Sequence, residues 1–323
     1  MNTQLLLDLF HRPSPSGEEG LTQEYIMDFL KKRNIDFVLD EVGNVYNISN
    51  QNKPLLSAHM DTVQNEADVQ MAKFTKISGN LVKGYGCIGA DDKCGIWIIL
   101  DLLEQGWKNE INFVFSVEEE IGGNGSKHFV SNNDLKHMPY GLILDRRGSG
   151  DIICYNNDYG TYEFETRLVT VGRPFGFSPN TGSFSDADKI NDQISCANLS
   201  VGYYNAHSRN EYVVLSQLEN TQNYVKSCIK TINESFEAPP KPVFGNFSGY
   251  GYGYDNEYSF FDESNFQSLS TKNHHQCECC YSQASSVVYI KTLGLEICNT
   301  CFYKLLEELE SDMMDFFLNQ GQM

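Results

Sequence analysis

Residues 111–123 read INFVFSVEEEIGG, an apolar run that ends in three glutamates and two glycines. A short run of this kind is typical of a strand that is buried on both faces of a sheet. Comparable runs, separated by helix-like segments such as CGIWIILDLLEQG, are LLSAH at 55–59, GLILD at 141–145 and CANLSVG at 196–202. This alternation predicts an α/β fold with a doubly wound, mostly parallel mixed sheet that is flanked by helices.

Local patterns add further elements to this prediction. The capping-box pattern Ser16-Gly17-Glu18-Glu19 predicts that an amphipathic helix opens there. Glu41-Val42-Gly43 is expected at the turn of a hairpin. We interpret EFETRLVT at 163–170 as a strand and residues 216–236 as a long helix that closes the series.

The composition is that of an ordinary globular protein, with 41% hydrophobic and 21% charged residues among 323. No apolar run is long enough for a membrane span, and no basic region precedes the short N-terminal apolar patch. We therefore expect a cytoplasmic protein. The formal net charge of −19 repels phosphate groups, so neither nucleic acid nor a membrane surface is an expected partner.

The chain divides by composition into three parts. Residues 1–238 carry the strand and helix patterns and are expected to form the main domain. Residues 239–273 are rich in Gly, Tyr, Ser and Asn without a stable period, which predicts a flexible linker. Residues 274–323 contain five of the ten cysteines and are expected to form a small module that ends in a helix.

Side chains of the types that commonly bind metal ions, histidine and carboxylates, follow the strand-like segments. His59 ends LLSAH, and Asp61 follows at the spacing that lets it hold the second ring nitrogen of a metal-bound histidine. Asp145 ends GLILD, and His207 follows CANLSVG. Because ligands of open α/β sheets gather beyond the carboxyl ends of the strands, we expect these side chains to lie together.

Further carboxylates occupy two other segment boundaries. Asp91, in Gly89-Ala90-Asp91-Asp92, either bridges two cations or simply caps the helix that follows. Glu118, Glu119 and Glu120 repel one another at the end of an apolar strand, which indicates nearby cations unless the run is a solvated surface.

Together these segments supply two imidazoles and at least three carboxylates, with one glutamate left to act as a base. Two divalent cations a few ångströms apart need such a set. Imidazole and carboxylate ligands without a thiolate favour zinc, and Co²⁺ or Mn²⁺ would also fit. The sequence therefore predicts a site for two Zn²⁺ ions.

The order of these motifs resembles that of the co-catalytic dinuclear zinc exopeptidases. His-x-Asp, Gly-Ala-Asp-Asp-Lys-x-Gly, Glu-Glu-x-Gly-Gly, a strand-end Asp and His-x-x-Asn-Glu-Tyr follow one another over residues 1–238. That clan includes enzymes of the peptidase T, aminoacylase, glutamyl aminopeptidase and lidless leucyl aminopeptidase types. The resemblance implies that His59 and Asp145 bind one zinc, that Glu120 and His207 bind the other, and that Asp91 bridges them.

The resemblance also implies roles beyond metal binding. Asp61 would orient His59, Glu119 would be the general base, and the Asp91–Asp92 peptide would be cis. Too few residues separate Asp145 from His207 for the inserted lid domain of many clan members, so we expect a lidless architecture. Within that segment, Asp186 lies in a stretch similar to the Gly-x-Ser/Thr-Asp-Ala of the clan and is interpreted as either a supporting or a plain loop residue.

The leading functional hypothesis is an exopeptidase, either an aminopeptidase or a dipeptidase, acting on short peptides. A carboxypeptidase or N-acyl amino acid deacylase of the same clan, acting on acyl amino acids, is the alternative. A catalytically silent adaptor that acts through the cysteine module is the alternative of another class.

The cysteine module has the spacing C-x2-C-x17-C-x2-C, formed by Cys277, Cys280, Cys298 and Cys301. This spacing predicts one structural Zn²⁺ in a module that resembles a zinc ribbon. Residues 274–323 carry seven acidic residues against two lysines, so docking of a protein partner or self-association is expected there, and not nucleic-acid binding.

Overall fold

The computed structural model describes residues 1–240, 266–276, 283–290 and 295–298. The chain forms two compact units, Met1–Val243 and Phe244–Met323. Within the described residues, no helix combines the length and the apolar character that a membrane span requires.

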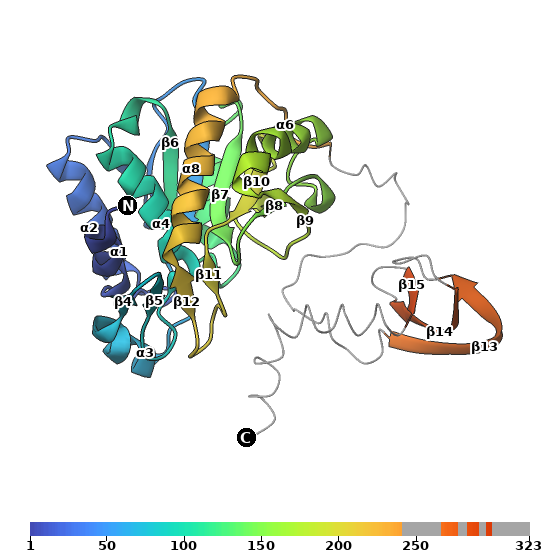
Figure 1. Cartoon of the computed structure of the whole chain (residues 1–323). Helices are drawn as coiled ribbons and strands as arrows, with labels where there is room; N and C mark the ends of the chain where they lie inside the picture. Colours follow the sequence, from blue (N-terminus) through green and yellow to red (C-terminus); the bar gives the residue numbers. More distant parts are fainter. Residues whose placement is uncertain (241–265, 277–282, 291–294, 299–323) are drawn as a thin grey trace. The chain divides into compact units, whose positions relative to one another are not determined.

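The first unit alternates helices and strands along the chain (Figure 1). Its helices are α1 (Thr3–Phe10), α2 (Gly20–Lys32), α3 (Glu66–Met71), α4 (Ala90–Glu104), α5 (Asn124–Asn132), α6 (Tyr162–Gly172), α7 (Ala187–Ile190) and α8 (Leu215–Thr231). Its strands are β1 (Val38–Leu39), β2 (Val45–Asn47), β3 (Leu55–His59), β4 (Lys76–Ser78), β5 (Leu81–Lys83), β6 (Asn112–Ser116), β7 (Gly141–Arg146), β8 (Asp151–Ile153), β9 (Ser178–Asn180), β10 (Cys196–Ser200), β11 (Tyr203–Tyr204) and β12 (Tyr212–Val214).

The main sheet has eight strands in the order β1-β2-β6-β3-β7-β10-β8-β9. Its four central strands, β6, β3, β7 and β10, are parallel, whereas β2 and β8 pair antiparallel with β6 and β10. The predicted mostly parallel, mixed α/β sheet is therefore confirmed. Strands β1 and β2 form the expected hairpin.

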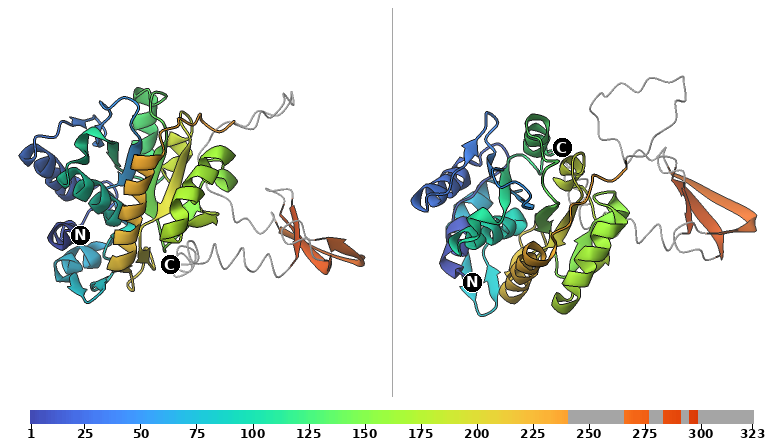
Figure 2. Two further views of the ribbon diagram at one scale, coloured as in Figure 1. Left: turned by 45° about the horizontal axis from the view of Figure 1, so that its top comes forward. Right: turned by 90° about the horizontal axis from the view of Figure 1, so that it is seen from above.

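Helices cover both faces of this sheet (Figure 2). Side chains alternate between the two faces along each central strand, and both sets are buried. In β6, Phe113 and Phe115 join a core with α1, α2, α4, α6 and α8, whereas Val114 joins a second core with α5 and α7. The double burial explains why apolar side chains occur on both faces of these strands.

A smaller antiparallel sheet, in the order β11-β12-β5-β4, lies beside the main one. Strands β11 and β12 pair with each other and are joined by residues 205–211, the loop that carries His207. All of the chain between Asp145 and His207 is described, and it forms β8, α6, β9, α7, β10 and β11 without a separate domain. This agrees with the lidless architecture that we expected.

Two local predictions are wrong. The segment EFETRLVT is not a strand but lies in helix α6, whose N-cap residue Thr161 accepts a hydrogen bond from Phe164 N through its side chain. The predicted capping box does not form either, because α2 begins at Gly20 and no side chain caps it. The Ser16 hydroxyl instead donates to Asp61 Oδ2 at 2.8 Å.

The second unit contains a three-stranded antiparallel sheet of β13 (Phe266–Gln276), β14 (Gln283–Ile290) and β15 (Leu295–Cys298). Strand β13 begins inside the 239–273 segment that we expected to be a linker. Cys298 ends β15, whereas Cys277, Cys280 and Cys301 lie outside the described residues, as does the expected C-terminal helix.

Candidate active site

The side chains predicted to bind metal converge at the carboxyl edge of the central strands. His59 ends β3, Asp145 is the penultimate residue of β7, and Glu120 follows β6. Asp91 belongs to the start of α4, and His207 comes from the loop between β11 and β12. Five segments that are distant in sequence thus meet at one place.

A first group joins His59, Asp91 and Asp145. Nε2 of His59 lies 3.1 Å from Asp91 Oδ1 and 3.4 Å from Asp145 Oδ1. One ligand atom from each of the three residues lies within 4.8 Å of the others, the spacing of atoms that can hold one metal ion.

A second group joins Asp91, Glu120 and His207 with the same spacing of ligand atoms. Nε2 of His207 lies 2.8 Å from Glu120 Oε1 and 3.2 Å from Asp91 Oδ2. Asp91 therefore presents one carboxylate oxygen to His59 and the other to His207. That is the arrangement that a bridging carboxylate requires.

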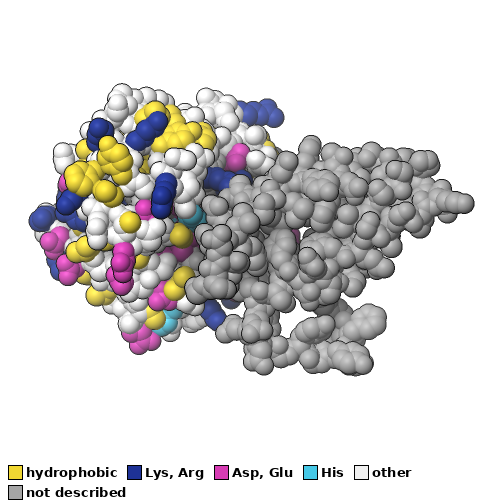
Figure 3. Space-filling view, turned by 90° about the horizontal axis from the view of Figure 1, so that it is seen from below, with side chains coloured by type: hydrophobic (Ala, Val, Ile, Leu, Met, Phe, Trp, Pro, Cys, Tyr) yellow, Lys and Arg dark blue, Asp and Glu magenta, His cyan; other side chains and the backbone are white. Residues whose placement is uncertain are grey.

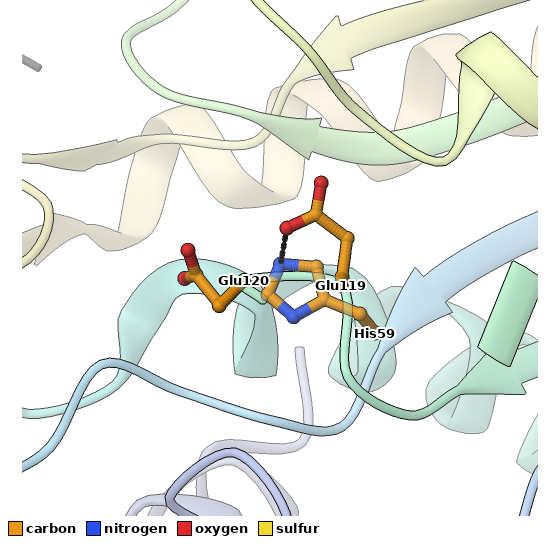
Figure 4. Close-up of side chains that lie close together, drawn as sticks. All are labelled: His59, Glu119 and Glu120. Atoms are coloured by element: carbon orange, nitrogen blue, oxygen red, sulfur yellow. Dashed lines mark ion pairs between the residues drawn. The ribbon is translucent and has the colours of Figure 1, made fainter. Parts of the chain in front are cut away.

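Glu119 lies over the first group. Its carboxylate points to the imidazole of His59, with Oε2 at 4.0 Å from His59 Nε2 (Figure 4). The side chain is only 6% exposed, and it also belongs to a group with His59 and Glu120 in which ligand atoms lie close together. Glu118 is directed elsewhere, since it accepts a hydrogen bond from Asn124 Nδ2 at 2.9 Å.

Asp61 is fully buried beneath this cluster and does more than the sequence suggested. His59 Nδ1 lies 2.9 Å from the backbone carbonyl of Asp61 and 3.3 Å from Asp61 Oδ1, so both groups orient the ring. The two carboxylate oxygens also accept the backbone N–H groups of Glu119, at 2.9 Å, and Glu120, at 3.1 Å. Asp61 thereby fixes His59 relative to the Glu119–Glu120 segment.

The sequence left two roles open for Asp91, bridging of two cations and capping of the helix. In the structure the cap belongs to its neighbour Asp92. Asp92 Oδ1 accepts Gly95 N at 2.9 Å, as a helix cap does, and Asp92 Oδ2 accepts His59 N at 3.2 Å. This leaves Asp91 free to face both histidines. The peptide bond between the two aspartates is cis, as the resemblance implied.

The electrostatics of the cluster indicate a site for positive charge. Burial, with the negative charge of neighbouring carboxylates, raises the pKa of Glu119, Glu120 and Asp145. Burial lowers the pKa of His207, but its hydrogen bonds to Asp91 and Glu120 outweigh this and raise it to about 11. Four buried or half-buried carboxylates thus surround two imidazoles, and cations between them would remove the repulsion.

Glu211 is a buried residue of the site that sequence reasoning did not single out. Its carboxylate accepts the backbone N–H groups of Gly89 at 2.8 Å, Ala90 at 3.0 Å and Asp91 at 3.2 Å. Burial and the charge of Asp91 raise the pKa of Glu211 to about 7, although these hydrogen bonds act in the opposite direction. The only hint in the sequence was its place in the His-x-x-Asn-Glu-Tyr motif.

The sequence did not decide whether Asp186 supports the site or is a plain loop residue. In the structure Asp186 is 2% exposed and accepts a hydrogen bond from the Ser116 hydroxyl at the end of β6. Burial raises its pKa. Its other oxygen, Oδ1, has no hydrogen-bond partner within the described residues. The contact with the end of β6 favours the supporting interpretation.

The described surface near this edge of the first unit is mixed in charge. On the face seen from below, basic side chains are scattered among acidic and apolar ones wherever side chains are described (Figure 3).

The fold and the cluster together are those of a metallopeptidase. The chain belongs to peptidase family M20/M25/M40, whose sequence profile matches residues 55–231. This confirms the resemblance to the zinc exopeptidase clan that the motifs indicated.

Similar proteins include a probable carboxypeptidase of Aspergillus niger, which is 28% identical over 151 residues. That match covers 41% of this chain and 36% of the relative, so this chain spans about a third of the relative's length. A probable carboxypeptidase of Emericella nidulans is 27% identical over 144 residues, covering 41% of this chain and 34% of that protein.

Solved structures share the fold at low sequence identity. The aminopeptidase PepT from Bacillus cereus has a TM-score of 0.56 at 15% identity, covering 71% of this chain and 97% of that one. A tripeptidase from Staphylococcus aureus has a TM-score of 0.56 at 16% identity, covering 72% and 97%.

Proposed function

We propose that this chain is an exopeptidase that hydrolyses short peptides with a pair of zinc ions. The observation that carries the proposal is the sharing of Asp91 between two groups of metal-type side chains, one completed by His59 and Asp145 and the other by Glu120 and His207. Membership in a peptidase family supports hydrolysis of a peptide or related amide bond.

The side chains present fit zinc. Each group offers one imidazole and two carboxylates, and no thiol belongs to either. Three protein ligands per ion leave a position for water or substrate, as catalytic zinc sites do. The backbone carbonyl of Asp61 holds Nδ1 of His59, so Nε2 is left as the ligand atom.

When bound, a zinc pair supplies a water of lowered pKa and stabilises negative charge on the carbonyl oxygen of the substrate. The residues of the chain supply the proton transfer. Glu119 is the proposed general base: an Oε atom takes a proton from the attacking water and gives it to the leaving amine. Its burial and its 4.0 Å distance from His59 Nε2 support this role, because they place the carboxylate next to the metal ligands and away from bulk water.

Aminopeptidase or dipeptidase action is the form of the proposal that we favour. The PepT and tripeptidase structures have the same fold, and no inserted domain lies between Asp145 and His207 in this chain. Carboxypeptidase action is the second candidate, supported by the names of the curated relatives. Cleavage of acyl amino acids would be a variant of that second candidate.

The experiment that tests this proposal measures hydrolysis of dipeptides, tripeptides and N-acyl amino acids by the full chain, with metal content determined on the same sample. We expect at least two zinc ions per chain and cleavage of substrates with a free amine. Preference for N-acylated substrates would favour the second candidate. A folded protein without metal and without hydrolysis would refute the enzyme proposal and favour a silent adaptor.

For the second unit, we propose that Cys277, Cys280, Cys298 and Cys301 hold one structural zinc ion and that the module binds a protein partner or a second copy of the chain. The cysteine spacing supports this proposal. Serine substitution of Cys298 should then remove one zinc ion per chain and leave peptide hydrolysis in place. We also propose a cytoplasmic location, which the five buried free cysteines of the described residues support, because thiols stay reduced in that compartment.

A further inference from the structure

Glu211 lies between the two loops that supply the second metal-binding group. It is four positions after His207, at the end of the same loop, and its side chain reaches the loop that leads into Asp91. Asp91 and His207 are both members of the group that Glu120 completes. One side chain therefore connects the backbone segments of two proposed ligands of one ion.

Every hydrogen-bond partner of the Glu211 carboxylate is a donor. Oε1 accepts the N–H groups of Ala90, at 3.0 Å, and Asp91, at 3.2 Å. Oε2 accepts the N–H of Gly89 at 2.8 Å and the thiol of Cys87 at 3.3 Å. Four donors on two oxygens suit a carboxylate, which only accepts, whereas an amide would set its NH₂ group against two of them.

The two ligands that Glu211 connects differ in how else they are held. The Asp91 segment has a second anchor, because Asp92 accepts His59 N and Gly95 N. The His207 side chain is 38% exposed, and the residue itself has a positive φ of 59°. Glu211, at 3% exposed, is the buried end of the His207 loop.

We propose that Glu211 is a positioning residue that fixes the His207 loop against the Asp91 segment, so that the second metal-binding group has its ligand spacing. This inference rests on the proposed function. It assigns Glu211 no contact with metal or substrate. Loss of its carboxylate should weaken the second ion far more than the first, since Asp92 still anchors Asp91 next to His59.

The test is a titration of the metal-free full chain with Co²⁺, followed by absorption spectroscopy. Cobalt bound by nitrogen and oxygen lacks the thiolate charge-transfer band, so these ions are counted separately from any held by cysteine. We compare the unsubstituted chain with Glu211→Gln, Glu211→Asp and Cys87→Ala. The matched control is Glu163→Gln, at an exposed glutamate on α6.

We expect two nitrogen- and oxygen-ligated ions in the unsubstituted chain, in Cys87→Ala and in the control. In Glu211→Gln the second ion should bind about 10–100-fold more weakly while the first is nearly unchanged, as for other residues that orient metal ligands. If Glu211→Gln binds both ions with the affinities of the unsubstituted chain, the proposal is overturned. Equal weakening of both ions would overturn it as well. If Glu211→Gln fails to fold, Glu211→Asp decides: it keeps the charge on a shorter arm, and unchanged affinity for the second ion would overturn the proposal.

The same titration distinguishes failure of the Glu211 role from failure of the proposed dinuclear site. An unsubstituted chain that folds but binds no nitrogen- and oxygen-ligated cobalt would refute the dinuclear site itself. Two ions bound with the same affinities by the unsubstituted chain and by Glu211→Gln would leave the site standing and refute only the role of Glu211.

Discussion

Substitution of Asp61 by asparagine tests how the cluster is held together. The carboxylate of Asp61 has no solvent exposure and accepts hydrogen bonds from Glu119 N, Glu120 N and the Ser16 hydroxyl, and its Oδ1 also lies 3.3 Å from His59 Nδ1. Asparagine has the same shape, but one of its terminal atoms is an NH₂ group that donates. Whichever way the amide turns, it faces one of the two backbone N–H groups and leaves that group without an acceptor.

The size of the effect follows from this count. The Ser16 hydroxyl can rotate and accept from the new NH₂ group, so it adds little to the cost. One orphaned buried N–H costs about 1–3 kcal/mol of unfolding free energy. In a domain the size of the first unit, each kcal/mol corresponds to roughly 2–4 °C, so we expect Tm to fall by about 2–12 °C. Because the orphaned group belongs to Glu119 or Glu120, activity should fall about 10–100-fold as well.

The assay is thermal unfolding of metal-free protein, monitored by circular dichroism, together with zinc content and peptide hydrolysis. Ser16→Ala is the matched control, since it removes a donor to the same carboxylate and leaves both backbone groups paired. Its Tm should change less than that of Asp61→Asn. An Asp61→Asn protein with the Tm and activity of the unsubstituted chain would refute the assigned role of this carboxylate.

Three further predictions concern catalysis, packing and the division of the chain. Glu119→Gln should keep its zinc ions and lose about 10²–10⁴-fold in turnover, whereas Glu118→Gln should stay active; equal activities would refute the base. In a denaturation assay, Gly125→Ala should lower the unfolding free energy by about 1–3 kcal/mol, because the added Cβ would lie 2.3 Å from a backbone carbonyl oxygen. Gly20→Ala should be neutral in the same assay, because no atom lies within 4 Å of its added Cβ. The fragment Met1–Val243 should fold and hydrolyse peptides only with metal, and its failure to fold would contradict the modular division.

The central sheet could be predicted because strands that are buried on both faces appear in the sequence as short apolar runs. Strand β6 is buried at every position, and so are β3 and β10. Helix α6 could not be predicted in this way, since EFETRLVT mixes β-branched and charged residues. Its signals were weaker: Phe164 and Leu168 are buried four positions apart, and Thr161 caps the helix.

The convergence of the proposed metal ligands could be predicted because each stands beside a recognisable strand or helix boundary in a known order. The residues that hold the ligands in place were harder to find. Asp61 and Glu211 act through backbone N–H groups that every sequence contains, at positions 58 and 120 residues away. No side-chain pattern records such a contact, so only the folded chain reveals it. The same reason explains why Ser16 was assigned to a helix cap and not to Asp61.

The wide separation of the ligands along the chain has a consequence for the lifetime of the protein. Residues 59, 91, 120, 145 and 207 come together only in the native state, so an unfolded chain offers no comparable site. Ions held by these residues, as we propose, would therefore act as a removable crosslink between segments that are far apart in the sequence, and mass action would favour the folded form as free metal rises. Scarcity of metal would then expose the chain to proteases, and the amount of this protein would follow the supply of its ions.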